Sequence, residues 1–98
     1  MKFIISGYSP NMIQAHDFAL DWHQVSEEEF QALIFDAYSC VGHEDIADCI
    51  NVAHNKEPVH ARPGDVLLYA NKERGVLKFY CIQVLRPLDV LQREYGEI

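Results

Sequence analysis

Two apolar segments in the second half of the chain, joined by a short polar stretch, constrain the fold most strongly. Residues 66–70 (VLLYA) predict a buried strand, and residues 76–85 (VLKFYCIQVL) predict a longer one that is rich in aromatic and β-branched side chains. The polar residues 71–75 (NKERG) between them predict a hairpin loop. The chain is therefore built on a sheet, and its other elements must pack on that sheet.

The first half of the chain predicts further strands and turns. Residues 2–6 are typical of a strand that ends at Gly7, and residues 8–11 of a turn, because Pro and Asn both favour turns. Residues 17–23 hold a second, poorly defined strand. A Pro-Gly pair within residues 62–65 marks the turn that leads into the first strand of the hairpin.

Helices are predicted between these strands. Ser26 followed three residues later by Glu29 fits a capping box, so a helix begins there and ends near residue 38 or 39. A second helix runs from residue 43 or 44 to residue 54, with Asn55 as its C-cap. A short last helix is predicted to open at Pro87, and its expected contacts are Leu88, Leu91 and Tyr95.

Together these elements predict an α+β fold, in which a mixed sheet of four or five strands carries two or three helices. The chain has 98 residues, of which 49% are hydrophobic, so we expect a single domain over residues 1–98. No apolar run approaches the roughly 18 to 20 residues that cross a bilayer. The opening segment is too short for the apolar region of a signal peptide. We therefore expect a cytoplasmic protein without a membrane partner.

The charge balance limits the partners of the chain. Eight Lys and Arg against fifteen Asp and Glu give a net charge of −7, and the basic residues are scattered without a cluster. Duplex DNA is therefore an unfavourable partner, because phosphate neutralisation supplies most non-specific affinity. A phosphate ligand would need a local pocket built from a few cationic side chains, backbone N–H groups or a helix N-terminus.

Cysteine and histidine spacing gives no sign of a metal site. Three cysteines without a C-x-x-C pair make a disulfide framework or structural zinc unfavourable and are best explained as buried thiols: Cys40, Cys49 and Cys81. Five histidines are present, and their spacing matches no known ligand pattern. We therefore expect neither a bound metal nor a cofactor.

One histidine has a position that suits proton transfer. His43 follows Gly42 at a predicted helix start, where N–H groups attract anions and glycine lets a ligand approach closely. An imidazole there can exchange a proton in phosphodiester chemistry. The alternative is that His43 merely caps or packs at the helix start.

Other candidate ligand contacts lie in predicted turns. Ser9 follows a strand and can contact a ribose or phosphate, or instead bond its own backbone. Arg62 and Arg74 can each form a bidentate phosphate contact, or remain solvated surface charges.

Three motifs resemble a small viral family that is typified by a protein of a turreted icosahedral archaeal virus. Residues 8–13 (YSPNMI) are similar to the family's aromatic-Ser-x-Asn-Met-Leu start. Residues 41–44 (VGHE) are similar to its Ile-Gly-His-(Asp/Glu) helix, and Arg62 falls at the family's spacing after the histidine. The order of elements agrees over nearly the whole chain, and the Gly-His element is the most specific piece.

This resemblance implies an activity. Anti-CRISPR members of the family are viral ring nucleases, which are homodimers that bind one cyclic tetra-adenylate across their interface without a metal. The ligand's own 2′-hydroxyl attacks the adjacent phosphorus and leaves linear products with a 2′,3′-cyclic phosphate. By this resemblance His43 is the general acid, Ser9 lies near the ribose and Arg62 near a phosphate. The implied set of ligand-binding residues is Ser9, Asn11, Gly42, Arg62, Glu73 and Arg74.

One departure from the family keeps other functions open. Family nucleases carry an Arg-Leu-x-Glu-Gly loop and an extra helix that closes over the ligand, whereas residues 71–75 here form only a short loop. Within it, residues 73–75 (ERG) are the candidate remnant. The first alternative to a nuclease is a sponge that binds a cyclic nucleotide without cleaving it. The second is a small dimeric interaction or DNA-binding protein.

Overall fold

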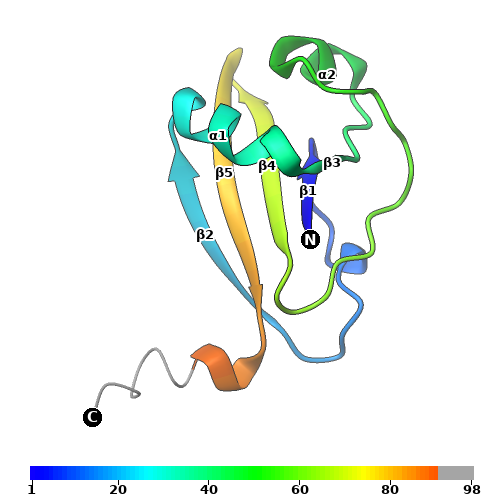
Figure 1. The fold of residues 1–98 in the computed structure, drawn as a ribbon, viewed down its shortest axis with the longest axis vertical. Coiled ribbons are helices and arrows are strands. Elements are labelled where there is room, and N and C mark those ends of the chain that lie inside the picture. Colours follow the sequence, from blue (N-terminus) through cyan, green and yellow to red (C-terminus); the bar gives the residue numbers. More distant parts are fainter. Residues whose placement is uncertain (91–98) are drawn as a thin grey trace.

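The computed structural model describes residues 1–90, which form a five-stranded mixed sheet with helices packed on it (Figure 1). The strands are β1 (Lys2–Ile5), β2 (Ala19–Val25), β3 (Tyr38–Ser39), β4 (Val66–Glu73) and β5 (Val76–Leu85). The helices are α1 (Glu27–Leu33) and α2 (Glu44–Ile50), with 3₁₀ turns η1 (Pro10–Met12) and η2 (Ile34–Asp36). The predicted α+β class is thereby confirmed.

The sheet has the order β2-β5-β4-β1-β3. β1 pairs in parallel with both β3 and β4, whereas β5 pairs antiparallel with β4 and β2. Because β1, β3 and β4 run in the same direction, their carboxyl ends lie toward one edge of the sheet. In Figure 1 this is the end near α2, and the chain's N-terminus lies at the other end of β1.

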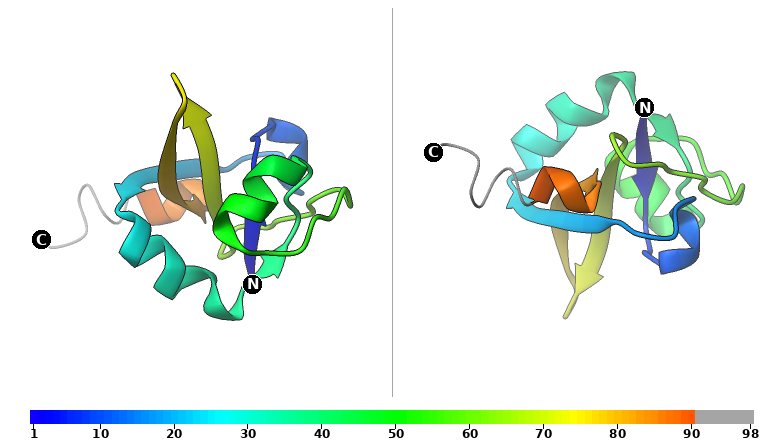
Figure 2. Two further views of the ribbon diagram at one scale, coloured as in Figure 1. Left: turned by 90° about the horizontal axis from the view of Figure 1, so that it is seen from above. Right: turned by 90° about the horizontal axis from the view of Figure 1, so that it is seen from below.

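Apolar side chains cover both faces of the sheet, and β1 shows why. Ile4 packs with Phe30 of α1 and with the buried face of α2, while its neighbours Phe3 and Ile5 belong to a second cluster on the opposite face. This alternation is the two-residue period of a strand. The second cluster is covered by η1 and the loop around Ala61, and Figure 2 shows α1 and η1 on opposite sides of the sheet.

The first predicted helix starts as expected and ends early. Ser26 Oγ accepts a hydrogen bond from the Glu29 N–H at 3.1 Å, which confirms Ser26 as the N-cap. The Glu29 carboxylate accepts from the Ser26 hydroxyl at 3.1 Å, whereas in a complete capping box it would accept from the Ser26 backbone N–H. The α-helix then stops at Leu33, and η2 leads into β3. The prediction that it would reach residue 38 or 39 was wrong, because Tyr38 and Ser39 are extended and pair with β1.

The second predicted helix is also shorter than the sequence suggested. α2 ends at Ile50, and Asn51 adopts the left-handed conformation at φ 57°. Asparagine tolerates this conformation, and the Val52 N–H bonds back to the Ala47 carbonyl at 3.0 Å. Asn55, the predicted cap, instead donates through its side chain to the Ser39 carbonyl at 2.9 Å.

The hairpin loop is shorter than predicted. Strand pairing continues to Glu73 and Val76, so the turn consists of Arg74 and Gly75 alone. Both have positive φ, 53° and 80°, as the two-residue turn of a right-handed twisted hairpin requires. At the other end of β5, residues 87–90 form a helical turn. The contacts predicted for Leu91 and Tyr95 lie outside the described residues.

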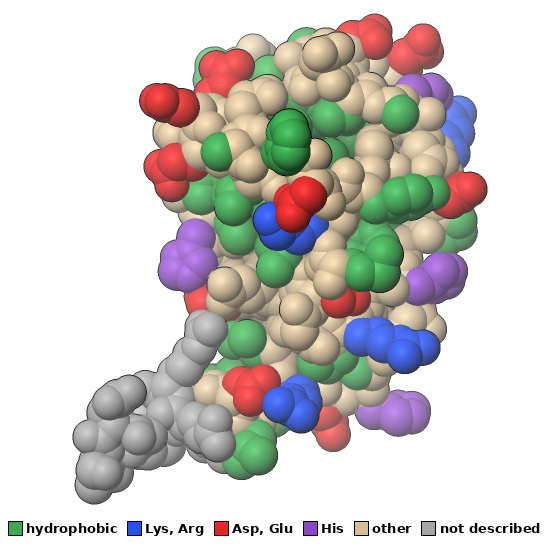
Figure 3. Space-filling model, viewed as in Figure 1, with side chains coloured by type: hydrophobic (Ala, Val, Ile, Leu, Met, Phe, Trp, Pro, Cys, Tyr) green, Lys and Arg blue, Asp and Glu red, His purple; other side chains and the backbone are tan. Residues whose placement is uncertain are grey.

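The basic side chains are scattered over the surface, as the sequence predicts (Figure 3). On the face drawn in Figure 3, Lys and Arg side chains occur singly among acidic ones. Within residues 1–90, no helix is long and apolar enough to span a membrane.

Candidate functional site

A pocket of about 420 Å³ lies at the carboxyl ends of β1 and β3. The segment after β1 and the segment after β3 meet there, because parallel strands end at the same edge of a sheet. The Asn55 N–H bonds to the Val41 carbonyl at 3.0 Å and brings the following loop alongside. Three chain segments line the pocket: Ser6, Gly7, Tyr8, Ser9 and Met12; Cys40, Gly42 and His43; and Lys56, Glu57, Pro58 and Val59.

His43 is held at this pocket by a serine. Its Nδ1 lies 2.7 Å from Ser6 Oγ, and its backbone N–H donates to the same oxygen at 3.3 Å. The His43 side chain is exposed, whereas Ser6 is only 6% exposed. Beside it, a Cβ on Gly42 would meet nothing within 4 Å, so the backbone there is open to a ligand. The sequence-predicted pair is therefore brought to a concave surface.

The helix that follows His43 contributes little to anion binding by itself. α2 has seven residues, and Glu44 and Asp45 occupy its first turn. These acids interact favourably with the helix dipole and oppose a second anion. The positive end of a helix, which the sequence suggested as the phosphate site, is therefore largely compensated within the chain.

Lys56 supplies the cationic side chain of the pocket. Among the described lining residues it is the one Lys or Arg, and it is exposed. The neighbouring carboxylate of Glu57 accepts a hydrogen bond from Tyr38 Oη at 2.8 Å, and this bond raises the pKa of Tyr38. Within the pocket, burial raises the pKa of the Cys40 thiol and of the Tyr8 hydroxyl, so both stay protonated at neutral pH.

Ser9 and Asn11 have different places in the structure. Ser9 lines the pocket, and its Oγ accepts a hydrogen bond from the Asn11 N–H at 3.4 Å. The backbone bond expected for a turn serine is thus present, and the hydroxyl still lies at the cavity. Asn11 is exposed within η1 and is not among the described lining residues.

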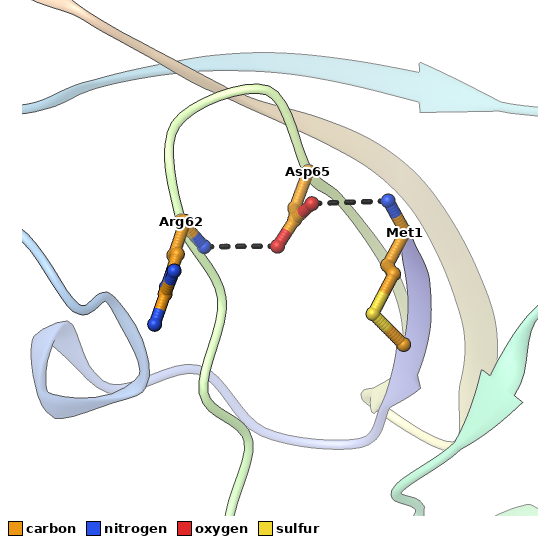
Figure 4. A network of polar contacts seen from close by, with 3 residues as sticks. All are labelled: Met1, Arg62 and Asp65. Carbon is orange, nitrogen blue, oxygen red and sulfur yellow. Dashed lines mark hydrogen bonds and ion pairs between the residues drawn. The ribbon is translucent and has the colours of Figure 1, made fainter.

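Arg62 lies at the opposite end of the sheet from His43. Its backbone N–H donates to Asp65 Oδ2 at 2.9 Å, and Asp65 Oδ1 forms an ion pair with the α-amino group of Met1 at 3.0 Å (Figure 4). This network stands at the start of β1, whereas the pocket stands at its end. A single chain therefore does not bring Arg62 and His43 to one site.

Glu73 and Arg74 lie at the tip of the β4–β5 hairpin and are exposed. Glu73 Oε1 accepts a hydrogen bond from Tyr80 Oη at 3.1 Å. Neither residue is among the described lining residues of the pocket. Of the six residues implied as ligand contacts, the structure therefore brings Ser9 and Gly42 to His43.

Sequence reasoning missed Ser6 and Lys56. Ser6 ends an apolar strand directly before Gly7, and that polar residue at a strand end was the available signal. Lys56 lies in the loop after α2 and has no local pattern. Both become site residues only through the pairing of distant segments.

The other thiols and histidines form no metal site. Within residues 1–90, no group of three or more His, Cys, Asp or Glu side chains is placed to hold an ion. His54 Nε2 instead lies 3.1 Å from the Gly42 carbonyl. Cys40 is buried and Cys81 partly so, but Cys49 is exposed, which corrects the expectation of three buried thiols.

The fold and the pocket define a small α+β protein whose mixed sheet carries a candidate site beyond its parallel strands. A solved structure with this fold is B116 of Sulfolobus turreted icosahedral virus. The TM-score is 0.71, the sequence identity is 18%, and the match covers 84% of this chain and 97% of B116. At this identity the likeness shows a shared fold. No family model matches the sequence, and no curated protein matches it either.

Proposed function

We propose that the chain is a ring nuclease, a phosphodiesterase that opens cyclic tetra-adenylate without a metal. The observation that carries the proposal is an exposed His43 fixed by Ser6 at 2.7 Å on a pocket that Ser9 and Gly42 also line. The motifs that resemble the viral family support it. In this function the protein is of viral or mobile-element origin and blunts cyclic-oligoadenylate signalling in the host cytoplasm.

The chemistry needs only one well-placed acid. The 2′-oxygen of a bound nucleotide forms a bond to the adjacent phosphorus, and the bond from phosphorus to the 5′-oxygen breaks. His43 gives a proton to the departing 5′-oxygen, and the 2′-hydroxyl proton passes to water. Because the nucleophile is already tethered to the phosphorus, positioning supplies much of the rate, and one general acid adds roughly 10² to 10⁴-fold.

Phosphate binding rests on local contacts. Lys56 supplies a positive charge at the pocket, and the open backbone at Gly42 admits a phosphate oxygen. At the pocket, the positive charge of Lys56 offsets part of the net charge of −7 on the chain. We expect a few short contacts to determine affinity, so that binding depends less on salt than in proteins with a basic face.

A homodimer completes the proposal. A symmetric pair offers the same pocket twice, which suits a cyclic ligand of even symmetry. Since Arg62 lies at the far end of the sheet within one chain, its proposed phosphate contact requires a second copy. Sedimentation equilibrium gives the mass in solution, and a monomer at micromolar concentration would exclude this part of the proposal.

Incubation with labelled cyclic tetra-adenylate in the presence of EDTA tests the activity. We expect linear products with a 2′,3′-cyclic phosphate from the wild-type chain and none from His43→Ala. His60→Ala is the matched control, because His60 is exposed and is not among the described lining residues. Absence of linear product at micromolar wild-type protein would contradict the proposal.

A sponge is the second candidate, and the hairpin favours it. The turn between β4 and β5 is only Arg74 and Gly75, so this segment provides no lid to exclude water from the ligand. Calorimetry followed by recovery of unchanged ligand would select the sponge. Turnover of the recovered ligand would exclude it.

A further inference from the structure

Ser6 is a buried polar residue, and both hydrogen bonds of its hydroxyl group are made with His43. Within residues 1–90 it is the polar or charged side chain that is almost completely removed from solvent. Its Oγ accepts from the His43 backbone N–H at 3.3 Å and lies 2.7 Å from Nδ1. A buried hydroxyl is retained where its hydrogen bonds are satisfied. Here His43 satisfies both.

The hydroxyl can serve both protonation states of the ring. A serine oxygen has one proton and two lone pairs, and the His43 N–H uses one lone pair. The Ser6 O–H can donate to Nδ1 of a neutral ring, and the ring proton then sits on Nε2. Toward a charged ring the hydroxyl turns and accepts from Nδ1–H. In either state Nε2 is the nitrogen that Ser6 leaves for another partner.

We propose that Ser6 is a positioning residue that orients the His43 ring and makes Nε2 the nitrogen that carries the transferable proton. In turnover, the charged ring keeps its Nδ1–H bonded to Ser6 while the Nε2–H bond breaks and the 5′-oxygen takes that proton. The ring is left neutral with its remaining proton on Nδ1, and a proton taken from water at Nε2 restores the charged acid. The catalytic part rests on the proposed function. The orientation of the ring belongs to the free protein and is tested without a ligand.

Nitrogen-15 correlation spectra of the imidazoles measure this orientation. At a pH high enough that the imidazole signals no longer change with pH, we expect the neutral ring of wild-type His43 to be the Nε2–H tautomer with Nδ1 as a hydrogen-bond acceptor. In Ser6→Ala, the chemical shifts of the two ring nitrogens should move toward the values averaged over the two tautomers. Ser6→Thr keeps a hydroxyl and should restore the wild-type pattern.

Ser39→Ala is the matched control for these spectra. It also removes a hydroxyl at the end of a parallel strand, but Ser39 donates to the Ala53 carbonyl at 2.6 Å. We expect it to leave the His43 tautomer unchanged. A wild-type His43 with its proton on Nδ1 overturns the inference even if no variant folds, and so does a Ser6→Ala spectrum equal to the wild-type one.

Kinetics separate this inference from the proposed function. Loss of one hydrogen bond to the ring should lower kcat about tenfold with KM little changed, and Ser6→Thr should recover most of the rate. If the spectra are as expected and no cyclic tetra-adenylate is cleaved, the proposed function fails and the orienting role stands. If cleavage occurs and Ser6→Ala has wild-type kcat, the positioning role fails and the nuclease stands.

Discussion

Replacing Lys56 by Gln tests whether the pocket binds a phosphate. A hydrogen bond to a charged group contributes about 1.5–3 kcal/mol, and the exposure of Lys56 favours the lower end of this range. We therefore expect the Kd for cyclic tetra-adenylate to rise about tenfold. The slope of log K against log salt should also fall by about 0.7, the value for one contact to a single strand.

Isothermal titration at several salt concentrations measures both quantities, in a His43→Ala background that prevents turnover. Lys72→Gln removes the same charge from a lysine that is paired with Asp45 at 3.3 Å and does not line the pocket. We expect this variant to change the Kd for cyclic tetra-adenylate less than twofold, because Lys72 is not among the described lining residues. Unchanged binding by Lys56→Gln would refute the contact. Equal losses in both variants would show a general charge effect instead.

The core, the hairpin and the thiols give further predictions. Phe30→Ala empties a fully buried position and should cost about 3–5 kcal/mol in urea unfolding; a loss under about 1 kcal/mol would contradict the packing. Arg74→Asn suits the positive φ better and should stabilise the chain by about 0.5–1 kcal/mol in the same assay. Because burial raises the pKa of Cys40 above 9.0, its protonated thiol contributes stability below that pH, and the contribution disappears as pH rises further. At a pH of about 8, iodoacetamide should label exposed Cys49 before Cys40.

Local chemistry explains which elements were predictable. The Ser26 N-cap and the two strands of the hairpin have strong signals within a few residues, and the structure confirms them. The end of α2 was misplaced because Asn51 and Asn55 are both acceptable caps by sequence. In the structure Asn51 is the C-cap, because the chain beyond it runs back along β3 and the Asn55 side chain bonds to the Ser39 carbonyl there.

β2 and β3 show the limit of periodicity. β2 is an edge strand with exposed Trp22 in its middle, so its apolar pattern is weak, and it runs to Val25 rather than stopping at residue 23. β3 has two residues and no pattern at all. Its place is set by pairing with β1.

The residues of the candidate site also differ in how far the sequence could predict them. Gly42 and His43 are neighbours in the sequence, and Ser9 lines the same pocket. Ser6 and Lys56 join them only because distant segments meet at one sheet edge. Arg62 satisfies the spacing of a motif but lies at the other end of β1, which spacing along a chain cannot reveal.

The place of β1 within the sheet also determines when the pocket exists during folding. β1 opens the chain, yet both of its partners follow much later in the sequence, and closing such long loops slows pairing. β4 and β5 are joined by a two-residue turn and can meet quickly. We expect the hairpin to form first and β1 to be inserted last. On the ribosome, the Ser6–His43 pair is therefore assembled only after the β4–β5 hairpin has been synthesised.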